Sequence, residues 1–121
     1  MSDSVTQVLA TALDGIAERQ QVTANNIANI DTPNFRATSV DFESQLQAAI
    51  DNGEFSSGSS APSASDLMTS TATDTPVGAN GNNVDLRKEE MVAIQTQYQY
   101  QTLTRAVSDQ FSLLKTAAAG E

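Results

Sequence analysis

Apolar residues near the N-terminus recur at alternating steps of four and three positions, and this spacing constrains the fold most. It defines the a/d seam of an amphipathic helix that pairs with another helix. We expect the helix to begin at Ser4, which can form a capping box with Gln7, and to end near Ile30, because Pro33 disfavours helical geometry at the residue before it. The seam comprises Leu9, Leu13, Ile16, Gln20, Thr23, Ile27 and Ile30.

A second, longer helix is predicted at the C-terminal end. Asp85 is its expected N-cap, the helix should run to about Ala118, and Gly120 is a possible terminator. Two helices with such seams can pair as an antiparallel or a parallel coiled coil, and a second apolar stripe indicates contacts with helices of other chains. The seam comprises Leu86, Ala93, Thr96, Tyr100, Leu103, Val107, Leu114 and Ala117, and the second stripe comprises Met91, Ile94 and Tyr98.

The region between the two helices has a different composition. A helical face is shared by Phe42, Leu46, Ala49 and Ile50, which predicts a short helix with Ser39 or Asp41 as its cap. Within residues 38–55 we expect an extended segment and then this helix. Residues 56–83 are rich in Ser, Thr, Ala, Gly and Asn, and we expect a flexible connector or mobile loop there. The fold class is therefore mostly α, divided into residues 1–37, 38–55, 56–83 and 84–121.

Composition excludes several functions. The net charge of −9 argues against nucleic acid and anionic membranes as partners. The absence of Cys and His removes disulfides, thiolate metal sites and the commonest general base, and we expect no cofactor. No basic stretch followed by an apolar run marks a signal peptide, so the expectation is a soluble protein that is not exported by a cleaved signal.

The acidic pairs Asp41/Glu43 and Glu89/Glu90 are best interpreted as solvated surface, because neither has a visible catalytic partner. No nucleophile elbow, phosphate loop or calcium loop is present, so an enzyme is not expected and no small-molecule substrate is implied. Tyr98 and Tyr100 alternate with glutamines. Either Tyr100 packs inward in the seam, or both tyrosines belong to a protein interface.

The dense polar stretch 25–37, where the first helix ends, allows two interpretations. Asn25, Asn26 and Asn29 can bond the free carbonyl groups of their own helix end. Alternatively, they bond a neighbouring backbone and fix the register of the departing chain. Residue types alone favour the first interpretation.

The same stretch resembles the N-terminal signature of flagellar rod and hook axial proteins. The resemblance rests on Asn26, Ile27, Ala28, Asn29, Thr32, Pro33 and Phe35, with Phe35 in place of the family's Tyr and Asn34 in place of its Gly. Residues 40–42, 81–86 and 100–115 are similar to the proximal rod branch of that family. This resemblance implies a non-enzymatic structural subunit of the flagellar basal body whose terminal helices pair as a coiled coil around an export channel.

The resemblance also implies partners and a location. The partners would be copies of the chain, other rod subunits, a basal-body adaptor, the inner-membrane ring and the export gate. The subunit would lie in the periplasmic rod after type III export without signal cleavage. Phe42 and Leu46 resemble a short export-gate motif. Another rod subunit, or a cytoplasmic coiled-coil adaptor or export chaperone, are the alternatives.

Overall fold

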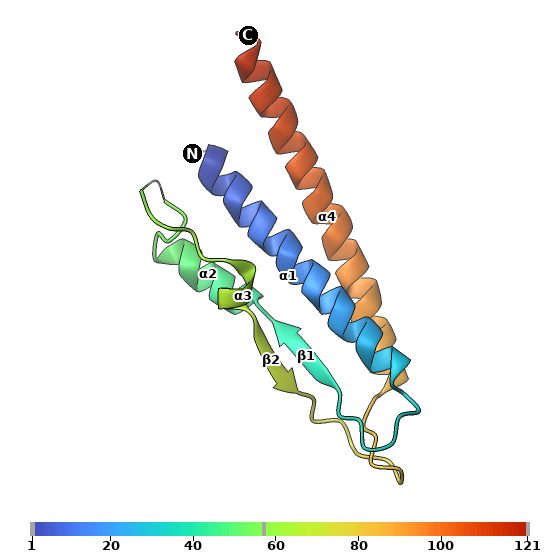
Figure 1. Cartoon of the computed structure of the whole chain (residues 1–121). Helices are drawn as coiled ribbons and strands as arrows, with labels where there is room; N and C mark the ends of the chain where they lie inside the picture. The colour runs from blue at the N-terminus through green and yellow to red at the C-terminus, as the bar shows by residue number, and fades with distance from the viewer. Residues whose placement is uncertain (1, 57, 121) are drawn as a thin grey trace.

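The computed structural model describes residues 2–56 and 58–120, with side chains from Ser4 onwards. Three layers follow one another in space (Figure 1). The long helix α1 (Ser2–Ala28) lies in the middle, and α4 (Leu86–Ala118) runs antiparallel along one side of it. On its other side pack β1 (Thr38–Asp41), α2 (Glu43–Asp51), α3 (Ala64–Leu67) and β2 (Thr69–Ala72). The mostly helical class, with long terminal helices, is thus confirmed.

The ends of α1 differ slightly from the prediction. The helix is already formed at Ser2, so Ser4 lies inside it and cannot be its N-cap, and the expected capping box is wrong. At the other end the helix stops at Ala28 rather than near Ile30, and turns follow. The helical bond from the Asn29 N–H to the Asn25 carbonyl is the last of its kind, because the Ile30 N–H donates to Ile27 three residues back and a turn begins.

The main core forms where α1 meets β1. Ala12 and Ile16 of α1 pack with Val40 and Phe42, and Leu103 of α4 contacts this cluster from the other side. Ala12 and Ile16 are four positions apart and therefore lie on one face of α1. The core is small, so polar contacts must help to position the surrounding elements.

Gly15 allows the Phe42 ring to lie directly against α1. A Cβ atom at position 15 would stand 2.7 Å from Cδ1 of that ring, a distance that real contacts do not reach. The glycine therefore creates the space that the largest core side chain fills. Because Phe42 precedes α2 immediately, this contact also fixes where α2 begins.

The segment after α1 agrees with the prediction in its type of structure. An extended strand, β1, precedes the nine-residue helix α2. The expected caps Ser39 and Asp41 are wrong, because the residue before α2 is Phe42 and no side chain caps the helix.

Residues 56–83 contain more regular structure than a flexible connector. Strand β2 pairs antiparallel with β1, from Thr38 opposite Ala72 to Asp41 opposite Thr69. All four β2 side chains are exposed, so backbone hydrogen bonds rather than apolar burial hold the strand in place. The turn of helix α3 buries Leu67 in a second small cluster with Ala49 and Phe55, and this gives the segment an anchor that its composition conceals.

Helix α4 matches the prediction at its start and its length. The Asp85 side chain accepts a hydrogen bond from the backbone N–H of Lys88 at 3.2 Å, which confirms the N-cap. Only Glu89 and Thr96 are buried on this 33-residue helix. Much of its apolar surface remains open, at Leu86, Met91, Ile94, Tyr98, Tyr100, Phe111, Leu113 and Leu114.

The two long helices do not pair uniformly along their length. They lie close together where α1 ends and α4 begins, and they diverge towards the two termini (Figure 1). An apolar gap of about 120 Å³, lined by Leu9 and Leu13 on α1 and by Val107 and Leu114 on α4, lies in the diverging part. The antiparallel arrangement is established, whereas a continuous coiled coil stays a prediction.

Candidate assembly junction

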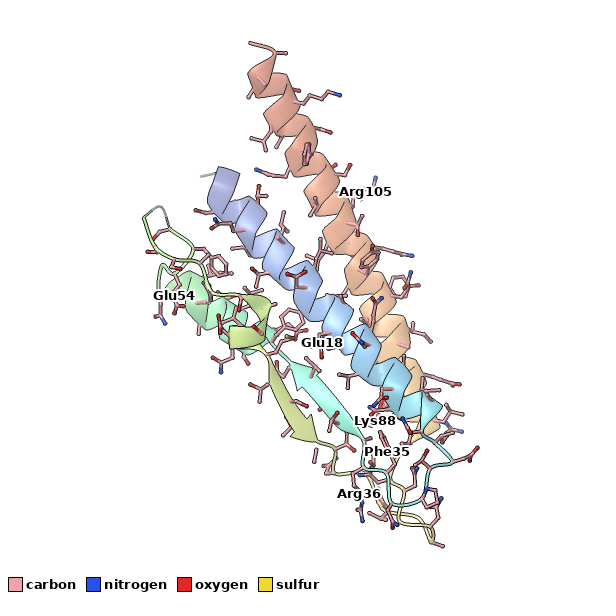
Figure 2. All side chains as sticks on the ribbon, in the orientation of Figure 1. Glu18, Phe35, Arg36, Glu54, Lys88 and Arg105 are labelled. Atoms are coloured by element: carbon pink, nitrogen blue, oxygen red, sulfur yellow. The ribbon has the colours of Figure 1, made fainter. Side chains whose placement is uncertain are left out.

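Two polar segments distant in sequence meet at one end of the molecule. We call residues 25–37 and 78–83 together the junction. Asn34 donates its backbone N–H to the carbonyl oxygen of Asn80 at 3.0 Å, and Asn83 donates to that of Phe35 at 3.2 Å. Figure 2 places Phe35 and Arg36 in this loop region, beyond the ends of the strands. Residues 26–37 and 81–83 of the junction belong to the stretches that carried the family resemblance.

Asn26 fixes the chain that leaves α1. Its amide Nδ2 donates to the carbonyl oxygen of Thr38 at 2.8 Å, and its Oδ1 accepts from the backbone N–H of Thr38 at 3.4 Å. The same Nδ2 donates to Oε1 of Glu89 on α4 at 2.7 Å. Asn26 is 1% exposed, so both contacts are shielded from water. This side chain acts on a neighbouring backbone, as the second interpretation of the asparagines expects.

Asn29 follows the other interpretation. Its Nδ2 donates to the carbonyl oxygen of Asn25 at 2.8 Å, and its Oδ1 accepts from the hydroxyl of Thr32 at 3.0 Å. The first bond goes to a carbonyl group of its own helix end, which also accepts the Asn29 backbone N–H at 3.2 Å, and the second shapes the turn that precedes Pro33. The asparagines therefore divide the two roles between them.

Asn82 and Asn83 complete the junction from the other segment. Asn82 Nδ2 donates to the carbonyl oxygens of Asn29 and Thr32, both at 2.8 Å. Asn83 Oδ1 accepts from the backbone N–H of Ala37 at 2.7 Å. Both asparagines are buried. From the sequence, residues 78–83 were expected in a flexible connector, and these contacts were missed, although the density of asparagine there was a visible signal.

Gly81 makes the close approach of the two segments possible. Its φ of +80° is unfavourable for other residues, and a Cβ there would lie 2.2 Å from Oδ1 of Asn34. Asn34 itself has a φ of +64°, a conformation that asparagine tolerates better than most residues. The junction therefore depends on specific side-chain contacts and on turns with positive φ angles.

The expectation for Glu89 is wrong. Its side chain is not solvated but 6% exposed, and it faces Asn26 across the α1–α4 contact. Burial raises the pKa of this carboxyl group, while the hydrogen bond from Asn26 partly opposes the rise. The register of α4 explains the error, since residues 89 and 90 lie on different faces and only the first turns towards α1.

Arg19 connects all three layers and was not identified from the sequence. Its guanidinium group donates to the carbonyl oxygen of Val40 at 3.0–3.1 Å, to Oε1 of Gln99 at 3.1 Å, and to the carboxylate of Glu43. It also lies 5.0 Å above the centre of the Phe42 ring. Arg19 holds the pKa of Glu43 below its usual value. Both Asp41 and Glu43 are exposed, as the surface interpretation expects, but Glu43 has a partner, Arg19, that the sequence did not reveal.

The remaining candidate residues lie in three environments. Phe42 is buried and Leu46 is half-buried, so the suggested export motif is part of the folded core. Ile27 and Phe35 are half-buried, whereas Ala28, Thr32 and Pro33 are exposed. Of the predicted seam, Ile16 is buried and Leu103 contacts the core. Tyr100 and Leu114 are exposed. The apolar gap is lined by Leu9, Leu13 and Val107.

The described residues contain no group of three or more acidic side chains positioned to hold a metal ion. Within the same part of the chain, no helix is long and apolar enough to cross a membrane. What the junction can do chemically is to bind backbone groups through amide side chains. It thereby fixes the angle at which the chain leaves α1 and enters α4.

Comparison with known proteins decides the family. A family model described as flagella basal body rod protein matches residues 7–36, which include most of the first junction segment. The flagellar basal body rod protein FlgB of Bacillus subtilis is 37% identical over 121 residues, covering 94% of this chain and 92% of the relative. The chain belongs to the FlgB family of flagellar basal body rod proteins.

Two further FlgB relatives extend the match across distant bacteria. The protein of Borreliella burgdorferi is 34% identical and covers 82% of this chain and 84% of its own. That of Escherichia coli is 32% identical and covers 89% and 88%. Because these matches span nearly the whole chain, they include α4 and the segment 78–83 as well as α1.

Proposed function

We propose that the chain is a structural subunit of the proximal rod of the bacterial flagellar basal body. In this role it assembles with copies of itself and with other rod subunits, lines the export channel, transmits torque and is required for motility. FlgB membership supports the rod assignment. The observation that carries it is that the two stretches resembling axial proteins, 26–37 and 81–83, bond each other in one junction.

The unequal burial of the helices supports an assembly role. The second apolar stripe of α4 is exposed at Met91 (59%), Ile94 (60%) and Tyr98 (68%), and Phe111 is exposed on another face of the helix (70%). A single chain gains nothing by exposing such residues, and contiguous exposed apolar surface marks contacts with other proteins. Neighbouring helices in a rod would cover this stripe. The two tyrosines then serve as interface residues, with glutamines between them.

Export is proposed to take place from an unfolded chain. Phe42 is 3% exposed in the folded structure, so an export gate could recognise Phe42 and Leu46 only before the core forms. The small core keeps the cost of unfolding low. The destination is then the periplasmic rod near the inner-membrane ring, the export gate and an adaptor.

Deletion of the gene tests this function directly. Cells without it should fail to build complete rods under electron microscopy and should not swim, and expression of the chain should restore both. Swimming deletion cells with complete rods would refute the proposal. Fractionation separates the alternatives, because a cytoplasmic chaperone would remain in the cytosol, whereas a rod subunit co-purifies with basal bodies. Placement of the chain in electron density of the basal body would distinguish it from another rod subunit.

The role of the junction needs its own variant. Replacement of Asn26, Asn29 and Pro33 by Ala removes the bonds from Asn26 to Thr38 and the turn after Asn29. We expect the triple variant to be exported but to form few complete rods. Normal rod assembly by this variant would reduce the junction to a helix end.

A further inference from the structure

A cavity of about 270 Å³ lies where α1, β1 and α4 meet. Aliphatic groups of Val22, Val40 and Val92 form part of its wall. Polar side chains, including Gln95 and Thr96, form much of the rest. One water molecule needs about 10–15 Å³ of such cavity volume. The cavity is many times larger, so it has room for one long side chain.

Glu89 presents an oxygen to this cavity. Its Oε1 accepts the hydrogen bond from Asn26, and no described residue donates to its Oε2. Among the described residues, no enclosed side-chain oxygen or nitrogen lacks a partner. Oε2 is therefore not sealed in the protein but borders the cavity, although the residue as a whole is 6% exposed.

The cationic groups around the cavity are engaged elsewhere. Arg19 pairs with Glu43, and the Lys88 ammonium group lies 3.8 Å from Asp74. Within the described part of the chain, no cation lies within ion-pair distance of Glu89. A buried carboxylate without an ion-pair partner is costly. Burial raises the pKa of Glu89, and the hydrogen bond from Asn26 and the charge of Lys88 oppose the rise only in part. The site thus lacks one hydrogen-bond donor, and a positively charged donor would satisfy it best.

We propose that this cavity receives a lysine or arginine side chain from a neighbouring subunit other than a second copy of the chain, and that Glu89 Oε2 accepts its hydrogen bond. This inference rests on the proposed rod function. The aliphatic wall fits the methylene stem of such a side chain, and the carboxylate fits its head. Copies of this chain each carry a net charge of −9 and repel one another, so charge complementarity favours a more basic subunit.

Glu89→Gln separates a structural role from partner binding. Glutamine has the same shape and can still accept from Asn26, but its amide group has no charge and can turn a donor towards the incoming cation. The folded chain should therefore lose no stability. Association should weaken at least tenfold, which corresponds to about 1.4 kcal/mol. Glu90→Gln is the matched control, because Glu90 is exposed on the next position of the same helix.

Competition in cells measures the association. Wild type and one variant are co-expressed, and mass spectrometry gives their ratio in purified basal bodies relative to whole cells. We expect Glu89→Gln to be depleted at least tenfold and Glu90→Gln to be incorporated like wild type. Equal incorporation of Glu89→Gln, or equal depletion of both variants, would overturn the proposal. Thermal unfolding of the purified variants shows that depletion does not reflect misfolding.

Suppressors of Glu89→Lys identify the occupant. We expect motility to be restored by changes of a lysine or arginine in another axial protein to a neutral or acidic residue. Suppressors that change Arg36, Arg87, Arg105 or Lys115 of this chain would instead assign a second copy. Failure to recover any suppressor in a saturating screen would also overturn the proposal. Failure of the rod function itself is distinguishable, because wild-type chain would then be absent from basal bodies.

Discussion

The two ends of the α1–α4 pair are built on different principles. At the junction end, Asn26, Asn82 and Asn83 are all buried and hydrogen-bonded within one chain, and only the second carboxylate oxygen of Glu89 is left for a neighbour. At the open end, by which we mean residues 2–13 and 104–118, the helices diverge and apolar side chains such as Phe111 remain exposed. Polar contacts therefore define the geometry of the isolated subunit, while its exposed apolar surface and the cavity beside Glu89 are left for contacts with neighbours.

Asn26→Ala should cause the largest loss of stability. It removes the bonds to Thr38 and leaves the buried Glu89 carboxylate without its only described donor. Removing one partner of a buried charged group costs about 2–4 kcal/mol in the free energy of unfolding. Urea unfolding of the purified chain measures the loss. Asn25→Ala is the control, because Asn25 is exposed; similar losses in both variants would contradict a special role for Asn26.

Gly15→Ala should have the next largest effect. The added methyl group would stand 2.7–2.8 Å from three ring carbons of Phe42, so the ring must move out of the main core. Overpacking of this kind costs about 1–3 kcal/mol. The double variant Gly15→Ala/Phe42→Leu should recover part of that loss, since leucine relieves the clash. If the single variant unfolds at the wild-type urea concentration, α1 and Phe42 do not touch as described.

Phe111→Ala and Leu113→Ala at the open end should hardly change the stability of the isolated chain. Both side chains are about two-thirds exposed, and substitutions at such sites stay within about 0.5 kcal/mol. Incorporation into basal bodies, however, should fall, because a neighbour would lose apolar contact. Ser112→Ala between them is the control. Normal incorporation of a chain that carries both substitutions would contradict an assembly role for the open end.

The pH dependence of Glu43 is the smallest expected effect. Its pKa is lowered by the hydrogen bond and charge of Arg19, so its stabilising contribution is present above the ordinary value of 4.5 and is lost as the pH falls through the lowered pKa. Glu43→Gln should thus destabilise the chain at pH 7 and have no effect in strong acid. Glu89 acts in the opposite sense, because its raised pKa makes the charged form unfavourable. Unfolding midpoints of wild type, Glu43→Gln and Glu89→Gln between pH 3 and 7 check both signs.

The sequence predicted those elements that depend on local periodicity or local capping. The apolar period identified both long helices, and Asp85 identified the start of α4. The extended segment followed by α2 was also recovered. These features need only residues within a few turns of one another. Their prediction does not depend on knowing which distant segments meet.

The contacts that were missed depend on distant segments. β2 has no apolar side chain that faces inward, so only its pairing with β1 explains the strand. Glu89 and Arg19 are ordinary surface residue types whose burial or bonding follows from the antiparallel register of α1 and α4. Asn82 could be interpreted only as a turn residue until the carbonyl groups of Asn29 and Thr32 were placed beside it.

Hydrogen exchange of the isolated chain tests the central claim most directly. The claim is that the asparagine contacts order the junction end within one chain, whereas the open end becomes ordered only when neighbouring subunits cover it. Amides of residues 26–40 and 82–96 should therefore exchange slowly, and those of residues 2–12 and 104–118 should exchange quickly. Uniform strong protection along both long helices, together with a fully helical monomer that melts cooperatively by circular dichroism, would contradict the claim.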